Sequence, residues 1–437
     1  MPVEQNLIRN GDLTYMQGTL PESWDRWSPR PELAPGFAVE PMGVAKGKAS
    51  LSVHGYDNGQ IGFWKQRCEG VEAGQWYLFS VHCQISKIAL PIESLWIKLE
   101  WQDALKNPIE KCIVSGLRRK GEDILVEDSV FAPKDAVSVV LELGLKHCTG
   151  TVRFSEPSLK RVASKLARSV RVSTVCYIPP EGTTPEKNLA FYAEKIDQAG
   201  QNHSDIVCLG ETINSAFTGR TPFDVAESLP GPSTDVLGRA AKRNRIWVVT
   251  SLNEREGNRV YNTAVLIDRE GKIVGKYRKT HLPETEILSG VTPGFEYPVF
   301  QTDFGVVGMQ VCYDNFFPEV ARSLVLNGAE ILFTPIWGDA RNGGVSWDIM
   351  ARARAIDNAV PFVASSFTPT RRSLIIDASG RILGDTKGQE GLVTAELKLG
   401  ERQIEPWLSV SSSAEWRRLY RTERRSETYG SLSRKPL

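Results

Sequence analysis

FGVVGMQVCYDNFFPEVAR, residues 304–322, contains the pattern that decides the fold of the larger part of this chain. An apolar strand leads to Cys312, then to a short polar turn, and then to the start of a helix near Pro318. A sharp turn between a strand and a helix exposes the residue at its tip beside N–H groups of the helix terminus. The segment therefore predicts a nucleophile elbow with Cys312 at its tip.

Two other segments place a reactive side chain just past an apolar strand. DIVCLGE, residues 205–211, ends in Glu211, and KIVGKYRK, residues 272–279, ends in Lys279. Ligands bind at the carboxyl ends of strands in α/β proteins, so we expect these two residues to converge on Cys312. Taken singly, the cysteine could be a small buried hydrophobe, Glu211 a helix cap and Lys279 a surface lysine. Their joint arrangement favours a catalytic site.

From about residue 170 onward, apolar strands alternate with helices. The spacing of apolar residues predicts helices over residues 188–199, 234–243, 318–327 and 345–358. Continuous apolar strands between helices indicate an α/β layer structure with the helices outside, and interposed hairpins make its sheets mixed. We expect this domain to span residues 170–400, followed by a C-terminal tail, residues 401–437, rich in arginine and serine.

Up to about residue 160 the apolar residues alternate with polar ones, as in residues 49–53, 77–83, 95–101 and 141–145. Short half-buried strands separated by turns are typical of an all-β sandwich or jelly roll. We therefore expect a first domain over residues 1–160. LKRVASKLARS, residues 159–169, is basic and rich in small residues, which predicts a solvated linker at residues 161–169.

Four segments of the first domain resemble the galactose-binding-like sandwiches, a group that includes many carbohydrate-binding modules. They are NLIRNGDL (6–13), PESWDRW (21–27), FWKQRCEGVEAGQWYLFSV (63–81) and GTVRFSEPSL (150–159). The resemblance implies a carbohydrate ligand or a purely structural or interaction role. Trp24, Trp27 and Trp64 could form a platform that stacks on sugar rings, or they could fill the core.

The composition excludes several classes of function. Charged residues make up 24% of the chain and its formal net charge is +1, so we expect no nucleic-acid partner and no anionic membrane surface. No apolar run is long enough to span a bilayer, and MPVEQNLIRNGDL lacks the apolar core of a secretory signal. The seven cysteines form no CxxC pair, which favours free thiols, a cytoplasmic location and no metal.

The second domain resembles the nitrilase, or carbon–nitrogen hydrolase, superfamily over about residues 170–400. The motifs, in the family's order, are DIVCLGE (205–211), GKYRKTHLPETE with GVTPG (275–294), GMQVCYDNFFPEVAR (308–322) and ARARAIDNAVPFVASS (351–366). The resemblance implies a four-layer α-β-β-α sandwich, hydrolysis of non-peptide carbon–nitrogen bonds through a thioester, and no cofactor. It also implies a homodimer that pairs the helices at residues 318–327 and 345–358.

The resemblance assigns a role to each matching residue. Cys312 is the nucleophile, Glu211 the general base, and Lys279 stabilises the oxyanion. Glu286 is a second carboxylate that positions the lysine or the substrate, with Glu284 as the alternative. From the chemistry of the residues we expect the backbone N–H of Tyr313 to be a second oxyanion donor. Four residues are candidates for the substrate pocket: Asn315, Phe316, Trp337 and Asn342. We expect His281 to have a structural role, orienting the loop after Lys279.

The residues after Cys312 narrow the range of possible substrates. Family members that hydrolyse nitriles typically have tryptophan and glutamate there, whereas the tyrosine–aspartate of this chain is commoner in amidases and carbamoyl hydrolases. Acid-recognising members often carry an arginine four residues after the cysteine, where a guanidinium grips a carboxylate in bidentate fashion. Phe316 stands at that position, so we expect an amide-like substrate with a neutral or apolar acyl group.

Three alternatives stay open. The same triad could hydrolyse nitriles, or it could transfer the acyl group to an amine instead of water. The chain could also be a carbohydrate- or protein-binding protein built on an inactive hydrolase scaffold. Release of ammonia from amides, ureides and nitriles would separate the enzymatic interpretations from the binding one.

Overall fold

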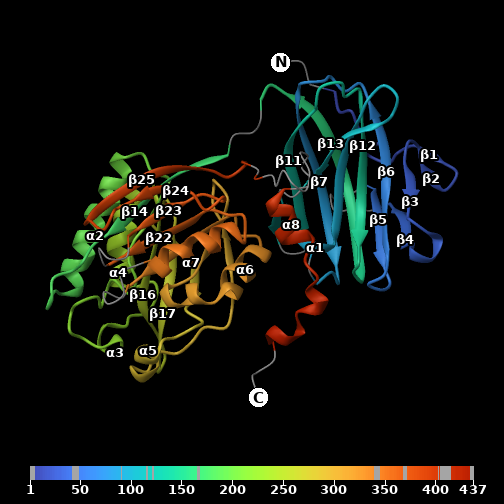
Figure 1. Cartoon of the computed structure of the whole chain (residues 1–437). Helices are drawn as coiled ribbons and strands as arrows, with labels where there is room; N and C mark the ends of the chain where they lie inside the picture. Colours follow the sequence, from blue (N-terminus) through green and yellow to red (C-terminus); the bar gives the residue numbers. More distant parts are fainter. Residues whose placement is uncertain are drawn as a thin grey trace. The chain divides into compact units, whose positions relative to one another are not determined.

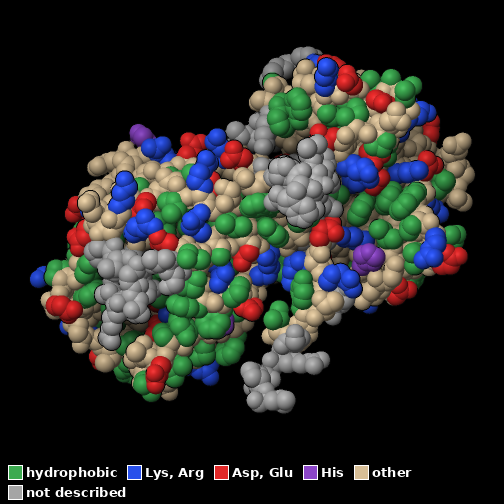
Figure 2. Space-filling view, in the orientation of Figure 1, with side chains coloured by type: hydrophobic (Ala, Val, Ile, Leu, Met, Phe, Trp, Pro, Cys, Tyr) green, Lys and Arg blue, Asp and Glu red, His purple; other side chains and the backbone are tan. Residues whose placement is uncertain are grey.

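The computed structural model describes residues 5–41, 49–89, 91–114, 117–120, 123–164, 168–338, 345–367, 372–401, 403 and 415–433 (Figure 1). The chain divides into two compact units. The first consists of Met1–Leu166 and Arg402–Leu437, and the second of Ala167–Glu401. On the face drawn in Figure 2, Lys and Arg side chains are intermingled with Asp and Glu, as the net charge near zero leads one to expect.

Two antiparallel sheets build the first unit, in the strand orders β10-β11-β7-β13-β5-β4 and β3-β6-β12-β8-β9. Their strands are β3 (Asp25–Trp27), β4 (Gly36–Glu40), β5 (Ser50–Gly55), β6 (Ile61–Glu69), β7 (Trp76–Ser86), β8 (Leu95–Gln102), β9 (Pro108–Ile113), β10 (Leu117–Lys120), β11 (Asp123–Phe131), β12 (Ser138–Lys146) and β13 (Gly150–Val162). A small pair, β1 (Met16–Gln17) and β2 (Leu20–Pro21), the 3₁₀ turn η1 (Pro31–Leu33) and α1 (Pro91–Ser94) complete it.

Side chains at alternate positions of both sheets form one shared core. Leu51, Phe79, Leu99 and Leu141, each from a segment with the predicted alternation of two, belong to it. Trp24 and Trp64 are also core residues, 2% and 0% exposed, so they are not available to stack on a sugar.

The C-terminal residues belong to the first unit instead of following the second as an independent tail. They form α8 (Trp416–Thr422), η4 (Ser426–Thr428) and η5 (Gly430–Ser433). Arg424 joins them to α1 through an ion pair with Glu93 of 2.5 Å. The predicted linker is also shorter than residues 161–169, because β13 ends at Val162 and β14 begins at Ser169.

The second unit is built on one mixed sheet in the order β18-β17-β16-β15-β14-β22-β21-β20-β19, extended by β23, β24 and β25. Its strands are β14 (Ser169–Cys176), β15 (Ile206–Cys208), β16 (Trp247–Glu256), β17 (Arg259–Ile267), β18 (Ile273–Arg278), β19 (Val299–Gln301), β20 (Val306–Met309), β21 (Ile331–Ile336), β22 (Phe362–Ser366), β23 (Leu374–Ile376), β24 (Ile382–Asp385) and β25 (Gly391–Lys398). Its two halves meet at a single pair, Cys176 with Ser366.

Helices cover this sheet from outside (Figure 1). They are α2 (Pro185–Gln201), α3 (Pro222–Val225), α4 (Pro232–Asn244), α5 (Glu284–Leu288), α6 (Pro318–Leu326) and α7 (Val345–Ile356), with the 3₁₀ turn η2 (Cys312–Phe316). The four helices predicted from periodicity correspond to α2, α4, α6 and α7.

Three clusters of buried residues define the layers of the second unit. One cluster lies between the two halves of the sheet and includes Val249, Leu266, Met309 and Phe333. A second packs α2 and α4 against the outer face of one half, and a third packs α6 and α7 against the outer face of the other half. The result is the expected α-β-β-α arrangement of four layers. Among the described helices of either unit, none combines the length and apolarity that a membrane crossing requires.

Candidate active site

The turn at Cys312 has the geometry of an elbow. Strand β20 ends at Met309, and the 3₁₀ turn η2 begins at Cys312 itself. Cys312 has a φ of +43°, a left-handed conformation that is uncommon for residues other than glycine. Such strain is found where the surrounding structure must hold a side chain in one direction. Cys312 thus opens the turn that follows the strand, which is where the elbow pattern in the sequence places it.

Glu211 and Lys279 meet in the interior of the second unit. Their side chains are 4% and 2% exposed, and the Lys279 Nζ lies 2.9 Å from the Glu211 Oε1. The ammonium also lies 2.7 Å from the Glu286 Oε2, so it is placed between two carboxylates. Burial would lower the pKa of Lys279, but Glu211, Cys312 and Glu286 raise it above its ordinary value, so the side chain stays cationic.

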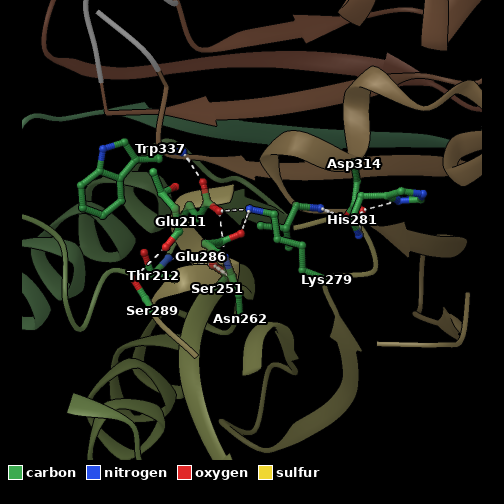
Figure 3. A network of polar contacts seen from close by, with 12 residues as sticks. Glu211, Thr212, Ser251, Asn262, Lys279, His281, Glu286, Ser289, Asp314 and Trp337 are labelled. Atoms are coloured by element: carbon green, nitrogen blue, oxygen red, sulfur yellow. Dashed lines mark hydrogen bonds and ion pairs between the residues drawn. The ribbon is translucent and has the colours of Figure 1, made fainter. Parts of the chain in front are cut away.

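Asn262 joins the two carboxylates from the other side. Its Nδ2 donates to the Glu211 Oε1 at 2.8 Å and to the Glu286 Oε1 at 2.7 Å, and its Oδ1 accepts from the Ser251 Oγ (Figure 3). The Ser251 Oγ also accepts from the backbone N–H of Thr212. Sequence reasoning missed Asn262, although a polar residue inside the apolar strand RVYNTAVLI was a usable signal.

Cys312 lies within the field of these charges. Burial and the neighbouring Glu211 raise the pKa of its thiol to about 12, while Lys279 acts in the opposite direction. The backbone N–H of Trp337 lies within hydrogen-bond reach of the thiol and donates to the Glu211 Oε2 at 2.5 Å. The thiol is therefore protonated at rest, beside a carboxylate that is anchored in place.

The pKa of Glu286 is raised by burial and by the neighbouring Glu211, while Lys279 and Asn262 act in the opposite direction. Glu284, the alternative suggested by the sequence, is exposed at the start of α5. The structure therefore brings Glu286, and not Glu284, to Lys279.

Asp314 ties the elbow to the strand end that carries Lys279. Its buried carboxylate accepts from the Tyr277 hydroxyl at 2.8 Å and from the Thr280 hydroxyl at 3.0 Å. The backbone N–H groups of Val311 and His281 each donate to it at 3.0 Å, and the His281 Nδ1 lies 3.1 Å from it. The predicted structural role of His281 in the loop after Lys279 agrees with these contacts (Figure 3).

The predicted pocket residues lie in different surroundings. Asn315 is fully buried, and its Oδ1 accepts from the Gln310 Nε2 at 3.2 Å, so it lies beneath the elbow. Phe316 is 48% exposed, and the half-buried Tyr313 packs against it with ring centroids 5.3 Å apart. The Trp337 indole stacks on Phe217 at 5.3 Å, beside Glu211. Asn342 lies outside the described residues.

Comparisons with known proteins identify the family to which the second unit belongs. The family described as carbon–nitrogen hydrolase matches residues 172–404, more than half of the chain. The chain belongs to the carbon–nitrogen hydrolase family, and its second unit has the nitrilase-like fold.

Two relatives and one solved structure illustrate the match. The hydrolase C26A3.11 of Schizosaccharomyces pombe is 30% identical over 267 residues, covering 56% of this chain and 80% of that protein. The omega-amidase NIT2 of Mus musculus is 29% identical over 231 residues, covering 48% and 83%. An amidase from Nesterenkonia sp. shares the fold, with a TM-score of 0.51, 20% identity, and coverage of 62% of this chain and 98% of the other.

Proposed function

We propose that the second unit hydrolyses linear amides through a thioester formed on Cys312. The observation that carries this proposal is a buried ammonium, Lys279, held between two carboxylates beside a thiol at a strained turn. Buried charges are costly, and groups with strongly shifted pKa values cluster at functional sites. Within the described ranges, no three His, Cys, Asp or Glu side chains gather closely enough to hold a metal ion.

In the first step the sulfur attacks the amide carbonyl carbon. A free thiol has a pKa of about 8.5, and Cys312 is less acidic than that, so Glu211 takes the proton as the carbon–sulfur bond forms. The carbonyl oxygen becomes an oxyanion, which Lys279 and the backbone N–H of Tyr313 stabilise. Glu211 then returns its proton to the nitrogen, the carbon–nitrogen bond breaks, and ammonia or an amine leaves.

In the second step water hydrolyses the thioester. As the water oxygen bonds to the acyl carbon, Glu211 accepts a proton from the water. Lys279 again stabilises the oxyanion. The carbon–sulfur bond then breaks, the sulfur regains its proton, and a carboxylic acid is released. Glu286 and Asn262 hold the Lys279 ammonium and the Glu211 carboxylate in position throughout both steps.

We assign a neutral acyl group to the substrate. The exposed Phe316 stands where a guanidinium would hold a substrate carboxylate, and Trp337, whose ring stacks on Phe217, lies beside the base. The tyrosine and aspartate that follow Cys312 favour an amide over a nitrile as the substrate. One relative is named an omega-amidase. Ammonia release from nitriles would reveal nitrile hydrolysis, and product analysis with an added amine would reveal acyl transfer.

Ammonia release from amides, ureides and nitriles tests the function directly. We expect turnover of neutral amides, unaffected by a chelator, and its loss in Cys312→Ala and Cys312→Ser. Lys279→Met should reduce kcat by about 10²–10³, the range seen when one oxyanion donor is removed. Glu211→Gln should bind substrate but acylate slowly. Retention of more than a few per cent of wild-type activity by Cys312→Ala would refute the mechanism.

For the first unit we propose a β-sandwich of the galactose-binding-like type. Two antiparallel sheets that share one core support the architecture. A carbohydrate ligand would have to use surface positions such as Trp27, which is 38% exposed and stacked on Phe63 at 4.5 Å. Binding of oligosaccharides to wild type but not to Trp27→Ala would support this role, and equal binding by both would refute it.

We also propose a homodimer of the second unit and residence in the cytoplasm. Ile349 on α7 is 61% exposed, which is compatible with pairing through the α6 and α7 helices, and Ile349→Glu should yield monomers in sedimentation. All seven cysteines are free thiols, as a reducing compartment would keep them.

A further inference from the structure

Among the described strands, β18, which delivers Lys279, pairs on one side only, and the Lys279 carbonyl also accepts from the backbone N–H of Gly294 at 2.8 Å. It is the edge strand of the sheet and pairs with β17. The register of this pair shifts between Leu266 and Ile267, at the Ile273 end of β18, whereas residues 275–278 pair with residues 263–266 without interruption. Near the site, Lys279 is anchored by its backbone N–H, which donates to the Asn262 carbonyl at 2.9 Å.

The alternation of side chains along β18 makes this register important. Tyr277 and Lys279 point into the interior and are 1% and 2% exposed, whereas Lys276 and Arg278 point to the opposite face of the sheet. A slip of one residue moves every side chain of a strand to the other face. Such a slip would replace the catalytic ammonium with the Arg278 guanidinium.

Glu254 of β16 binds the outward side chains of β18. Its carboxylate is 3% exposed and lies 2.7 Å from the Lys276 Nζ. The Arg278 guanidinium reaches both of its oxygens, at 2.9 and 3.1 Å, and the Thr263 hydroxyl donates to it at 2.7 Å. Both outward cations of β18 are thus bound by one buried carboxylate.

Two further contacts fix the guanidinium itself. Arg278 forms a second bidentate pair with the exposed Glu256, at 3.0 and 2.8 Å, and lies over the Tyr261 ring at 3.9 Å from its centroid. Burial would raise the pKa of Glu254, but the bonds from Arg278, Lys276 and Thr263 lower it to about 2, so the carboxylate is ionised at neutral pH.

We infer that Glu254 is a positioning residue for the proposed amide hydrolysis: through Arg278 and Lys276 it holds the end of β18 so that Lys279 faces Glu211 and Cys312. The inference rests on the proposed function only for its kinetic readout. A second readout, the reactivity of the Cys312 thiol, does not require turnover, because the Lys279 charge lowers the pKa of that thiol.

Glu254→Gln tests the inference, with Glu256→Gln as the matched control. Both replace a carboxylate that binds Arg278, but Glu256 is 59% exposed and is not paired with Lys276. For Glu254→Gln we expect kcat per titrated active site to fall at least tenfold with KM within twofold of wild type. Alkylation of Cys312 by iodoacetamide should slow by about three- to fourfold for each unit that its pKa rises, because the thiolate fraction falls tenfold while the thiolate becomes more nucleophilic. The other six cysteines are buried, which makes this measurement selective.

Glu256→Gln should stay within twofold of wild type in both measurements. The inference is overturned if folded Glu254→Gln matches wild type in kcat per site and in alkylation rate, because the clamp would then contribute only to stability. If Glu254→Gln does not fold, Glu254→Asp keeps the charge with a shorter reach, and unchanged rates in that variant would overturn the inference equally. A wild type without amidase activity would refute the proposed function, while the alkylation comparison would still decide the positioning role.

Discussion

Replacing Asp314 with asparagine should damage both stability and catalysis, although the two side chains have the same shape. Each carboxylate oxygen accepts from one backbone N–H, that of His281 at Oδ1 and that of Val311 at Oδ2. The hydroxyls of Thr280 and Tyr277 can reverse and accept from an amide NH₂. A backbone N–H cannot, so either orientation of asparagine leaves one of them facing another donor.

The loss of stability expected for Asp314→Asn follows from the hydrogen bonds that it removes. One hydrogen bond to a charged acceptor is lost and one buried donor is left unpaired, which together cost about 3 kcal/mol. This is about a hundredfold in the ratio of folded to unfolded protein. Catalysis should fall as well, because Asp314 holds the elbow against the loop after Lys279, and misplacement by about 1 Å can cost 10²-fold in rate.

Urea unfolding and hydrogen exchange of residues 304–322 would measure the first effect, and kcat per titrated Cys312 the second. Tyr277→Phe is the matched control, because it removes one neutral donor from the same carboxylate and should cost only about 1 kcal/mol. If Asp314→Asn were as stable as wild type and turned over within twofold of it, the carboxylate would not be the link between elbow and loop.

Three further predictions concern other groups. Glu286→Gln should lower kcat at least tenfold while Glu284→Gln leaves it unchanged, since only Glu286 contacts Lys279; equal effects in steady-state kinetics would contradict this. Glu254→Gln should lose about 3 kcal/mol of stability at pH 7, corresponding to a pKa lowered from 4.5 to about 2. That difference should persist above pH 4.5 and vanish as the pH falls towards 2, as urea unfolding at several pH values would show. A fragment of residues 168–401 should fold and retain amidase activity, whereas an insoluble or inactive fragment would show that the first unit completes the second.

Much of the site could be predicted because its residues stand in sequence where strands end. Glu211, Lys279 and Cys312 each follow an apolar run, and the structure brings these strand ends together. Glu286 could not be separated from Glu284 by spacing, because both belong to the short helix α5 and the turn before it decides which side chain points inward.

The rest depended on contacts between distant segments, which periodicity does not contain. Asn262 lies in a strand that looks apolar apart from this residue, and its two partners are 51 and 24 residues away in sequence. The return of the C-terminal segment to the first unit was missed for a similar reason: the pair that joins Arg424 to Glu93 spans 331 residues. Local composition made this segment resemble a tail.

The charges buried around the site also explain why its sequence signal is strong. The side chains of Glu211, Lys279 and Asp314 are at most 4% exposed, in a chain whose other charged residues lie mostly at the surface. A buried charge is destabilising unless partners satisfy it, and a cluster of hydrophobic residues would usually be at least as stable. Each charge therefore needs its own set of donors or acceptors, supplied here by Asn262 and by the strand end that carries Lys279. Natural sequences break the rule of apolar interiors mainly where chemistry requires it, so charged residues that directly follow apolar strands indicate a reaction site from the order of the amino acids alone.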